Sequence, residues 1–233
     1  MPTILLHAIG LDADSWRFAA IPGGVAMDLP GFGRQPVPER PLDMDGIADD
    51  VIARAPDGPL DVVGVSLGSM VAMHAGLRHR DRVRSLVLAC AAASSSPDVM
   101  RQRAEAVRTE GVAAQVPGTI DRWFTEAALA DAAHPAVRYA RERLASDDPV
   151  AFEQGWLAIA GHDVRADLPS LDIPVTVIGG RQDRGATVEA VTALQSLLPN
   201  SRLVLLEGPH MLYMEHPREF ADAVAAHLRW VEG

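Results

Sequence analysis

Lysine is absent from this chain of 233 residues, and all 21 basic side chains are arginine. Its absence excludes a lysine Schiff base and the lysine-containing phosphate loop of nucleotide-hydrolysing enzymes. Cysteine is nearly absent as well, because Cys90 is the only one. One cysteine excludes an internal disulfide framework and a thiolate metal cluster. Cys90 ends an apolar run that begins at Val83, where a buried and unreactive thiol is expected.

Positive charge and long apolar runs are also scarce. The chain has 31 acidic residues and a formal net charge of −10, which argues against nucleic acid or an anionic membrane as a partner. No apolar run approaches the roughly 18 residues of a membrane-spanning helix. The first residues, MPTILL, have neither a basic region nor a cleavage-site pattern. We therefore expect a cytoplasmic protein.

What the chain does have is enough apolar sequence for a large core, with 48% hydrophobic residues. Short, wholly apolar segments alternate with helical patterns at residues 42–55, 67–77, 187–198 and 217–230. Six strands are predicted, at residues 3–6, 25–29, 60–65, 83–89, 175–178 and 202–206. A polar loop is expected to lead from the first strand to Trp16. Strands of this kind predict an α/β fold with a parallel sheet covered on both faces.

The alternation stops between residues 94 and 168. This segment contains only helical patterns, divided by Pro97, Pro117, Pro135 and Pro149. It predicts a cap of about four helices, inserted between core segments 1–93 and 169–233. The aromatic residues of the cap either pack on the core or line a pocket, and Trp123 is the candidate substrate contact.

The most informative motif is Gly64-Val65-Ser66-Leu67-Gly68, a G-x-S-x-G at the point where a strand gives way to a helix. That context is typical of the nucleophile elbow. The turn is so tight that Ser66 is expected in a strained backbone conformation, and side chains at positions 64 and 68 would collide with neighbouring backbone. The alternative is an ordinary turn in which Ser66 caps the helix. Whether an acid and a histidine accompany Ser66 distinguishes the two interpretations.

Two residues follow later strands, first an acid and then a histidine, which is the chain order of the partners that accompany a nucleophile elbow. Asp183 comes after the strand at 175–178, and His210 after the strand at 202–206. His210 is the predicted base and Asp183 the predicted acid, whereas Asp163, Asp167 and Asp172 precede their nearest strand. His162, near the end of the cap, is the rival base.

A serine nucleophile also needs two N–H donors for an oxyanion. One is the backbone N–H of Leu67, directly after the serine. The other is predicted to be the N–H of Ile9, in the segment His7-Ala8-Ile9-Gly10 that follows the first strand. His7 itself is expected to tie loops together by hydrogen bonds.

Together these segments resemble the α/β-hydrolase superfamily along almost the whole chain. The matching stretches are LLHAIGLDADSW, DLPGFGRQPVP, GVSLGS, PVTVIGGRQD and GPHMLYMEHPREF. Within the cap, RQRAEAVRTEG and IDRWFT are similar to 3-oxoadipate enol-lactonases, and small bacterial esterases and cofactor-free haloperoxidases share much of this pattern. Ser69 departs from the family by replacing a second glycine after the elbow, and residues 184–187 lack the usual proline.

The resemblance implies an α/β-hydrolase fold with a shortened, mainly parallel sheet of about six strands, because the family's first antiparallel hairpin is missing. An exposed sheet edge fits either a monomer or a homodimer. The implied activity is cofactor-independent hydrolysis of a small ester or lactone through Ser66, His210 and Asp183.

Several points stay open at the level of sequence. A perhydrolase-type haloperoxidase, a C–C bond hydrolase and a ligand-binding relative with incidental turnover are the alternative functions. An anionic substrate would need a cap arginine, and the candidates, which the sequence does not rank, are Arg101, Arg108, Arg122 and Arg138.

Overall fold

The computed structural model describes the whole chain, residues 1–233, and its centre is a single sheet. The strands are β1 (Thr3–Leu6), β2 (Gly24–Met27), β3 (Leu60–Val65), β4 (Val83–Ala89), β5 (Val175–Gly180) and β6 (Ser201–Leu206). Their order is β2-β1-β3-β4-β5-β6, and every neighbouring pair is parallel. The predicted six-stranded sheet is confirmed, and it is parallel throughout.

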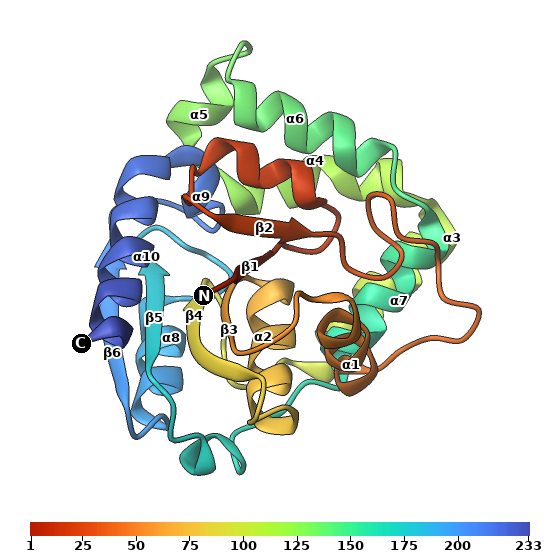
Figure 1. Ribbon diagram of the computed structural model, residues 1–233. Coiled ribbons are helices and arrows are strands. Elements are labelled where there is room, and N and C mark those ends of the chain that lie inside the picture. The colour runs from red at the N-terminus through yellow and green to blue at the C-terminus, as the bar shows by residue number, and fades with distance from the viewer.

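Helices cover the sheet on both faces, as the apolar strands require (Figure 1). The helices of the core are α1 (Met44–Arg54), α2 (Leu67–Arg78), α8 (Val188–Ser196), α9 (Leu212–Glu215) and α10 (Pro217–Glu232). Two short 3-10 helices, η1 (Ala13–Phe18) and η2 (Leu168–Ser170), complete it. The expected loop before Trp16 is therefore partly wrong: Asp12 accepts a hydrogen bond from the N–H of Asp14 and caps η1.

Between β4 and β5 the chain forms five helices rather than about four. They are α3 (Pro97–Glu110), α4 (Val112–Trp123), α5 (Glu126–Ala130), α6 (Pro135–Ala145) and α7 (Pro149–Ala160). Pro117 was expected to divide two helices but lies inside α4. The division falls at Gly111, whose φ of +81° suits glycine and ends α3. In Figure 1, α4, α5 and α6 lie above the sheet, and α3 and α7 lie beside it.

One hydrophobic cluster of 65 buried residues joins the sheet to these five helices. Phe124 and Phe152 belong to it, so these two cap aromatics pack as core residues. The boundaries predicted for a separate cap, 94–168, stay a prediction. So does the oligomeric state, although β2 lies at a sheet edge and Val25 on it is exposed.

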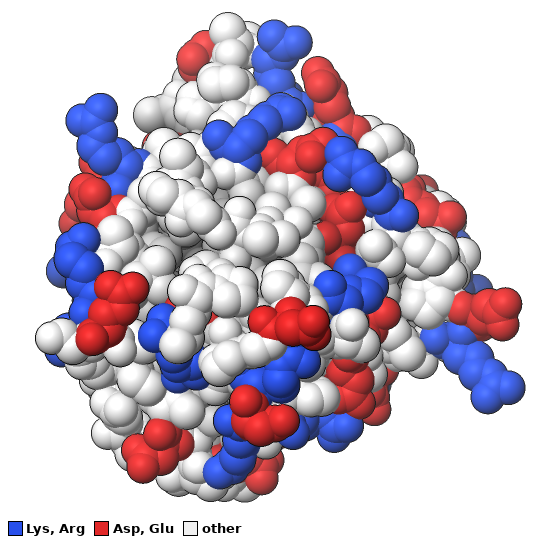
Figure 2. All heavy atoms as spheres, viewed as in Figure 1, with Lys and Arg blue, Asp and Glu red and all other residues white.

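On the face of the molecule in Figure 2, arginines and acidic residues alternate around a largely uncharged centre. No continuous basic surface is visible on that face. Among the helices, none combines the length and the apolar composition that crossing a membrane would require.

A buried polar chain ties α10 to the sheet through His227, which is only 2% exposed. Its Nε2 lies 3.0 Å from the hydroxyl of Ser85, and its Nδ1 lies 2.9 Å from the hydroxyl of Thr176. Because Ser85 donates its proton to Asp61 (2.5 Å), it must accept from Nε2–H of His227. His227 is therefore held as the neutral Nε2–H form.

This burial makes stability depend on pH. Burial lowers the pKa of His227 from 6.5 to about 4, so between these values the unfolded chain binds the proton and the folded chain does not. The stabilisation is complete above pH 6.5 and is lost as the pH falls toward 4. We expect the wild type to lose about 3 kcal/mol more unfolding free energy than His227→Gln between pH 7 and 4. Urea unfolding at several pH values measures it, and parallel curves for the two proteins would contradict it.

Candidate active site

Ser66 stands between β3 and α2 with φ +55° and ψ −115°, the strained conformation that the motif predicts. The two glycines allow this turn. A Cβ added to Gly64 would lie 2.3 Å from the carbonyl oxygen of Gly68, and one added to Gly68 would lie 2.2 Å from that of Leu6. Both contacts are with backbone atoms, so only glycine fits at either position.

Ser69, which departs from the family pattern, strengthens the same turn. Its buried hydroxyl donates to the carbonyl of Gly64 (2.7 Å) and accepts from the N–H of Ala89 (2.9 Å). These bonds connect the first turn of α2 to β3 and β4, so the elbow is fixed to two central strands.

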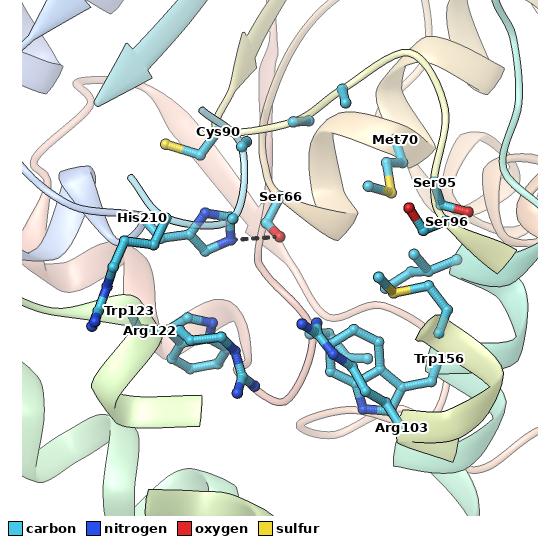
Figure 3. A pocket seen from close by; sticks show the side chains of 18 of the residues that line it. Ser66, Met70, Cys90, Ser95, Ser96, Arg103, Arg122, Trp123, Trp156 and His210 are labelled. Atoms are coloured by element: carbon cyan, nitrogen blue, oxygen red, sulfur yellow. Dashed lines mark hydrogen bonds between the residues drawn. The ribbon is translucent and has the colours of Figure 1, made fainter. Parts of the chain in front are cut away.

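His210 lies on the loop after β6 and contacts both other residues of the predicted triad. Its Nε2 is 3.0 Å from the Oγ of Ser66, and its Nδ1 is 2.8 Å from the Oδ2 of Asp183. Since an ionised carboxylate only accepts, Nδ1 carries the proton and Nε2 is free to accept from the serine hydroxyl. The structure thus brings the three side chains together, and Figure 3 shows the imidazole facing Ser66. Their catalytic roles stay a prediction.

Asp183 is buried beside His210, on the loop that follows β5. Burial alone would raise the pKa of this carboxyl, but the charge and hydrogen bond of His210 outweigh it and lower the pKa. The N–H groups of Gly185 (2.7 Å) and Ala186 (2.9 Å) also donate to Oδ1. Asp183 is therefore held ionised and oriented toward the imidazole.

The predicted oxyanion donors are buried and unused. Ile9 and Leu67 are 2% and 1% exposed, and neither backbone N–H donates to another group of the chain. Buried N–H groups are almost always paired in folded proteins. Ile9 lines the same cavity as Ser66, and Leu67 directly follows it in the chain. An oxygen bound beside Ser66 would supply the missing acceptor.

His7 ties two loops, as expected. Its Nε2 accepts from the N–H of Leu29 (3.0 Å), and its Nδ1–H donates to the carbonyl of Ala8 (2.8 Å). Burial lowers the pKa of His7 to about 4, so the ring stays neutral. Both ring nitrogens are used by these bonds, so His7 holds the backbone next to Ile9 in place.

His162, the rival base, is buried away from the cavity that contains Ser66. Its Nε2–H donates to the carbonyl of Ala92 (3.1 Å), and its Nδ1 lies 3.1 Å from the Nε2 of His74. Neither nitrogen is available to Ser66, so the geometry favours His210.

One group of side chains could in principle hold a metal ion. Ligand atoms of Cys90, Asp183 and His210 lie within 4.8 Å of one another. Burial, together with the nearby carboxylate of Asp183, raises the pKa of the Cys90 thiol well above its usual value. A protonated thiol is a poor ligand, and Asp183 is already bonded to His210. These three side chains are therefore poorly suited to hold a metal ion, and the bond between Asp183 and His210 suits proton transfer instead.

Ser66 and His210 open into a cavity of about 270 Å³ that is also lined by residues of α3, α4 and α7. Trp123 from α4 and Trp156 from α7 form part of its wall, so the candidate substrate contact Trp123 is in a position to touch a ligand. Figure 3 shows both tryptophans on the cap side of the cavity, facing Ser66 and His210.

Of the four candidate cap arginines, only Arg122 lines this cavity. The other three are exposed, and each pairs with an acid one turn away: Arg101 with Asp98, Arg108 with Glu105 and Arg138 with Glu142. Sequence reasoning missed Arg103, which also lines the cavity. Its position in the helix could have indicated this. Arg103 follows the cavity residue Met100 by three positions, so the two share one face of α3.

Known proteins resemble this chain along nearly its whole length. The model of the alpha/beta hydrolase fold family matches residues 2–217. 3-Oxoadipate enol-lactonase 2 of Acinetobacter baylyi is 28% identical over 211 residues, 88% of this chain and 78% of that protein. Pimeloyl-[acyl-carrier protein] methyl ester esterase of Chromobacterium violaceum is 31% identical over 245 residues, 97% and 93% of the two chains.

A solved structure agrees with the fold. The enol-lactonase from Burkholderia xenovorans LB400 superposes with a TM-score of 0.93 at 24% identity, covering 98% of this chain and 91% of that one. With the elbow, the parallel sheet and the family match over most of the sequence, this chain belongs to the alpha/beta hydrolase fold family.

Proposed function

We propose that this protein is a cofactor-independent serine hydrolase that cleaves a small carboxylic ester or lactone. The observation that carries the proposal is the hydrogen-bonded series from Ser66 through His210 to Asp183, with bonds of 3.0 and 2.8 Å, at the wall of a cavity. A serine hydroxyl is a weak nucleophile until a neighbouring base takes its proton, and this series provides the base and the group that orients it.

In the first half of the reaction, Ser66 Oγ attacks the carbonyl carbon while its proton moves to Nε2 of His210. Asp183 stabilises the imidazolium that forms. The oxyanion accepts hydrogen bonds from the N–H groups of Ile9 and Leu67, which have no partner within the chain. His210 then returns the proton to the leaving oxygen, and an acyl-enzyme on Ser66 remains.

The second half repeats these steps with water. His210 takes a proton from the water as it attacks the acyl carbon, the same two N–H groups hold the oxyanion, and the proton returns to Ser66. A single histidine therefore serves both halves. No step needs a metal or an organic cofactor.

The relatives support an ester or lactone as the substrate class. Two of the similar proteins are named for an enol-lactone and for a methyl ester, both of which present an acyl carbon bonded to oxygen. A cavity of about 270 Å³ is at the small end for ligand sites and supports a small substrate.

The proposal is tested by steady-state kinetics on a panel of short p-nitrophenyl esters and the enol-lactone of 3-oxoadipate. We expect ester hydrolysis, and a kcat/KM of about 10⁶ M⁻¹s⁻¹ or more for a native substrate. High turnover of the enol-lactone would assign the narrower lactonase activity. Absence of turnover on every ester and lactone would contradict the proposal.

A further inference from the structure

Two arginines extend into the cavity from different cap helices. Arg103 comes from α3 and Arg122 from α4, and both line the space that contains Ser66. In Figure 3 their guanidinium groups lie on the cap side, across from Ser66 and His210, between Trp123 and Trp156. They therefore face the position of a substrate bound at the serine.

Neither arginine forms an ion pair with an acidic side chain, although both are half-buried and line the cavity. Arg122 donates only to the hydroxyl of Thr119 (3.2 Å), and Arg103 lies over the ring of Trp156, 4.8 Å from its centre. No aspartate or glutamate lines the cavity. A third arginine in its wall, Arg184, is already paired with Asp121 at 3.2 Å.

Two half-buried like charges without a counterion cost free energy, and no acidic side chain in the cavity wall offsets that cost. Burial and the neighbouring Arg122 lower the pKa of Arg103. Burial also lowers the pKa of Arg122; the charge of Asp121 opposes this, and the smaller effect of Arg184 lowers the pKa further. An anion held between Arg103 and Arg122 would replace this repulsion by charge-assisted hydrogen bonds.

The backbone holds Arg122 at a fixed place relative to the predicted base. The N–H of Met211, next to His210, donates to the carbonyl of Trp123 (3.0 Å), the last residue of α4. Trp123, Trp156 and Met70 also line the cavity, together with Ser94, Ser95 and Ser96. The two tryptophans lie beside the arginines, so this side of the cavity is both cationic and aromatic, and Ser66 and His210 lie across from it (Figure 3).

We propose that Arg103 and Arg122 form a carboxylate-binding site, so that the substrate is an ester or lactone of a dicarboxylic acid with one carboxylate left free. Guanidinium groups bind a carboxylate through two parallel N–H donors, and two of them can share its oxygens. Trp123 and Trp156 would contact the short carbon chain. The assignment of the scissile bond rests on the proposed function, whereas the anion site rests on the arginines.

The test compares two substrates that differ only at the far end, p-nitrophenyl hydrogen glutarate and the neutral p-nitrophenyl hexanoate. We expect wild type to prefer the glutarate ester by at least about tenfold in kcat/KM. In Arg103→Gln and in Arg122→Gln, kcat/KM for the glutarate ester should fall about 10–100-fold more than for the hexanoate ester. Arg101→Gln, an exposed arginine on the same helix, is the matched control and should leave both values unchanged.

The carboxylate site would be overturned if wild type showed no preference for the anionic ester. It would also be overturned if the arginine substitutions lowered kcat/KM equally for both esters. A binding measurement separates this result from failure of the proposed hydrolase. Glutarate is titrated into Ser66→Ala and followed by tryptophan fluorescence, since Trp123 and Trp156 line the cavity. Saturable binding that either arginine substitution weakens supports the site even if no ester is hydrolysed. Absent binding, or binding that neither substitution changes, refutes it.

Discussion

Ser66→Ala is expected to lower kcat for ester hydrolysis by at least about 10⁴-fold while leaving the fold intact. The substitution removes the only oxygen that can attack the carbonyl with its proton already directed at a base, the Nε2 of His210 at 3.0 Å. The backbone is not affected, because alanine adopts the same φ and the serine side chain makes no other hydrogen bond. Unchanged circular dichroism and thermal unfolding should accompany the loss.

His210→Ala should cost a similar factor, and the double variant should be little worse than either single one, because groups that act as a unit are not additive. Ser95→Ala is the matched control, since Ser95 also lines the cavity but its hydroxyl has no histidine partner. It should change kcat less than about threefold. A Ser66→Ala enzyme that keeps more than about a hundredth of the wild-type kcat would mean that another group is the nucleophile.

Gly68→Ala is expected to destabilise the protein by about 3 kcal/mol or more, lowering the melting temperature by roughly 10 °C. Its new Cβ would lie 2.2 Å from the carbonyl oxygen of Leu6 and 2.9 Å from that of His7. Both are backbone atoms, at the end of β1 and in the loop that leads to Ile9. Helix α2 must therefore move away from β1, which also displaces the predicted oxyanion donor and lowers activity in the remaining folded protein.

Gly118→Ala is the matched control for this substitution. Gly118 lies in α4, and its nearest neighbour would be a flexible arginine nitrogen, Nη1 of Arg122, at 3.5 Å. Alanine there should stabilise the protein by up to about 1 kcal/mol, because it favours a helix over glycine. Melting of Gly68→Ala within about 2 °C of wild type would contradict the packing argument.

The sheet could be predicted because its strands are apolar along their whole length and need only local sequence to be recognised. Ser66, Asp183 and His210 could be named for a similar reason: each follows a strand, and in a parallel sheet the ends of all strands meet at one edge. The structure then places Asp183 and His210 at hydrogen-bond distance although 27 residues separate them. Strands β5 and β6 are neighbours in the sheet, so the loops that follow them begin side by side.

The cap was less predictable because its helices are positioned by packing against distant segments. Pro117 was expected to end a helix, but a glycine with positive φ, Gly111, separates α3 from α4. Arg103 was not among the candidate arginines, since its cavity position depends on which face of α3 packs toward α7. Composition cannot reveal that face. The spacing of the apolar residues Met100 and Val107 along the helix marks it, and Arg103 lies on the same face.

Covalent labelling tests directly whether Ser66 is an activated nucleophile. The protein is treated with a fluorophosphonate, digested and examined by mass spectrometry. We expect one adduct per chain, located on the peptide that contains Ser66, and no adduct in Ser66→Ala or His210→Ala. Absence of labelling in the wild type, or equal labelling of Ser66→Ala, would contradict it.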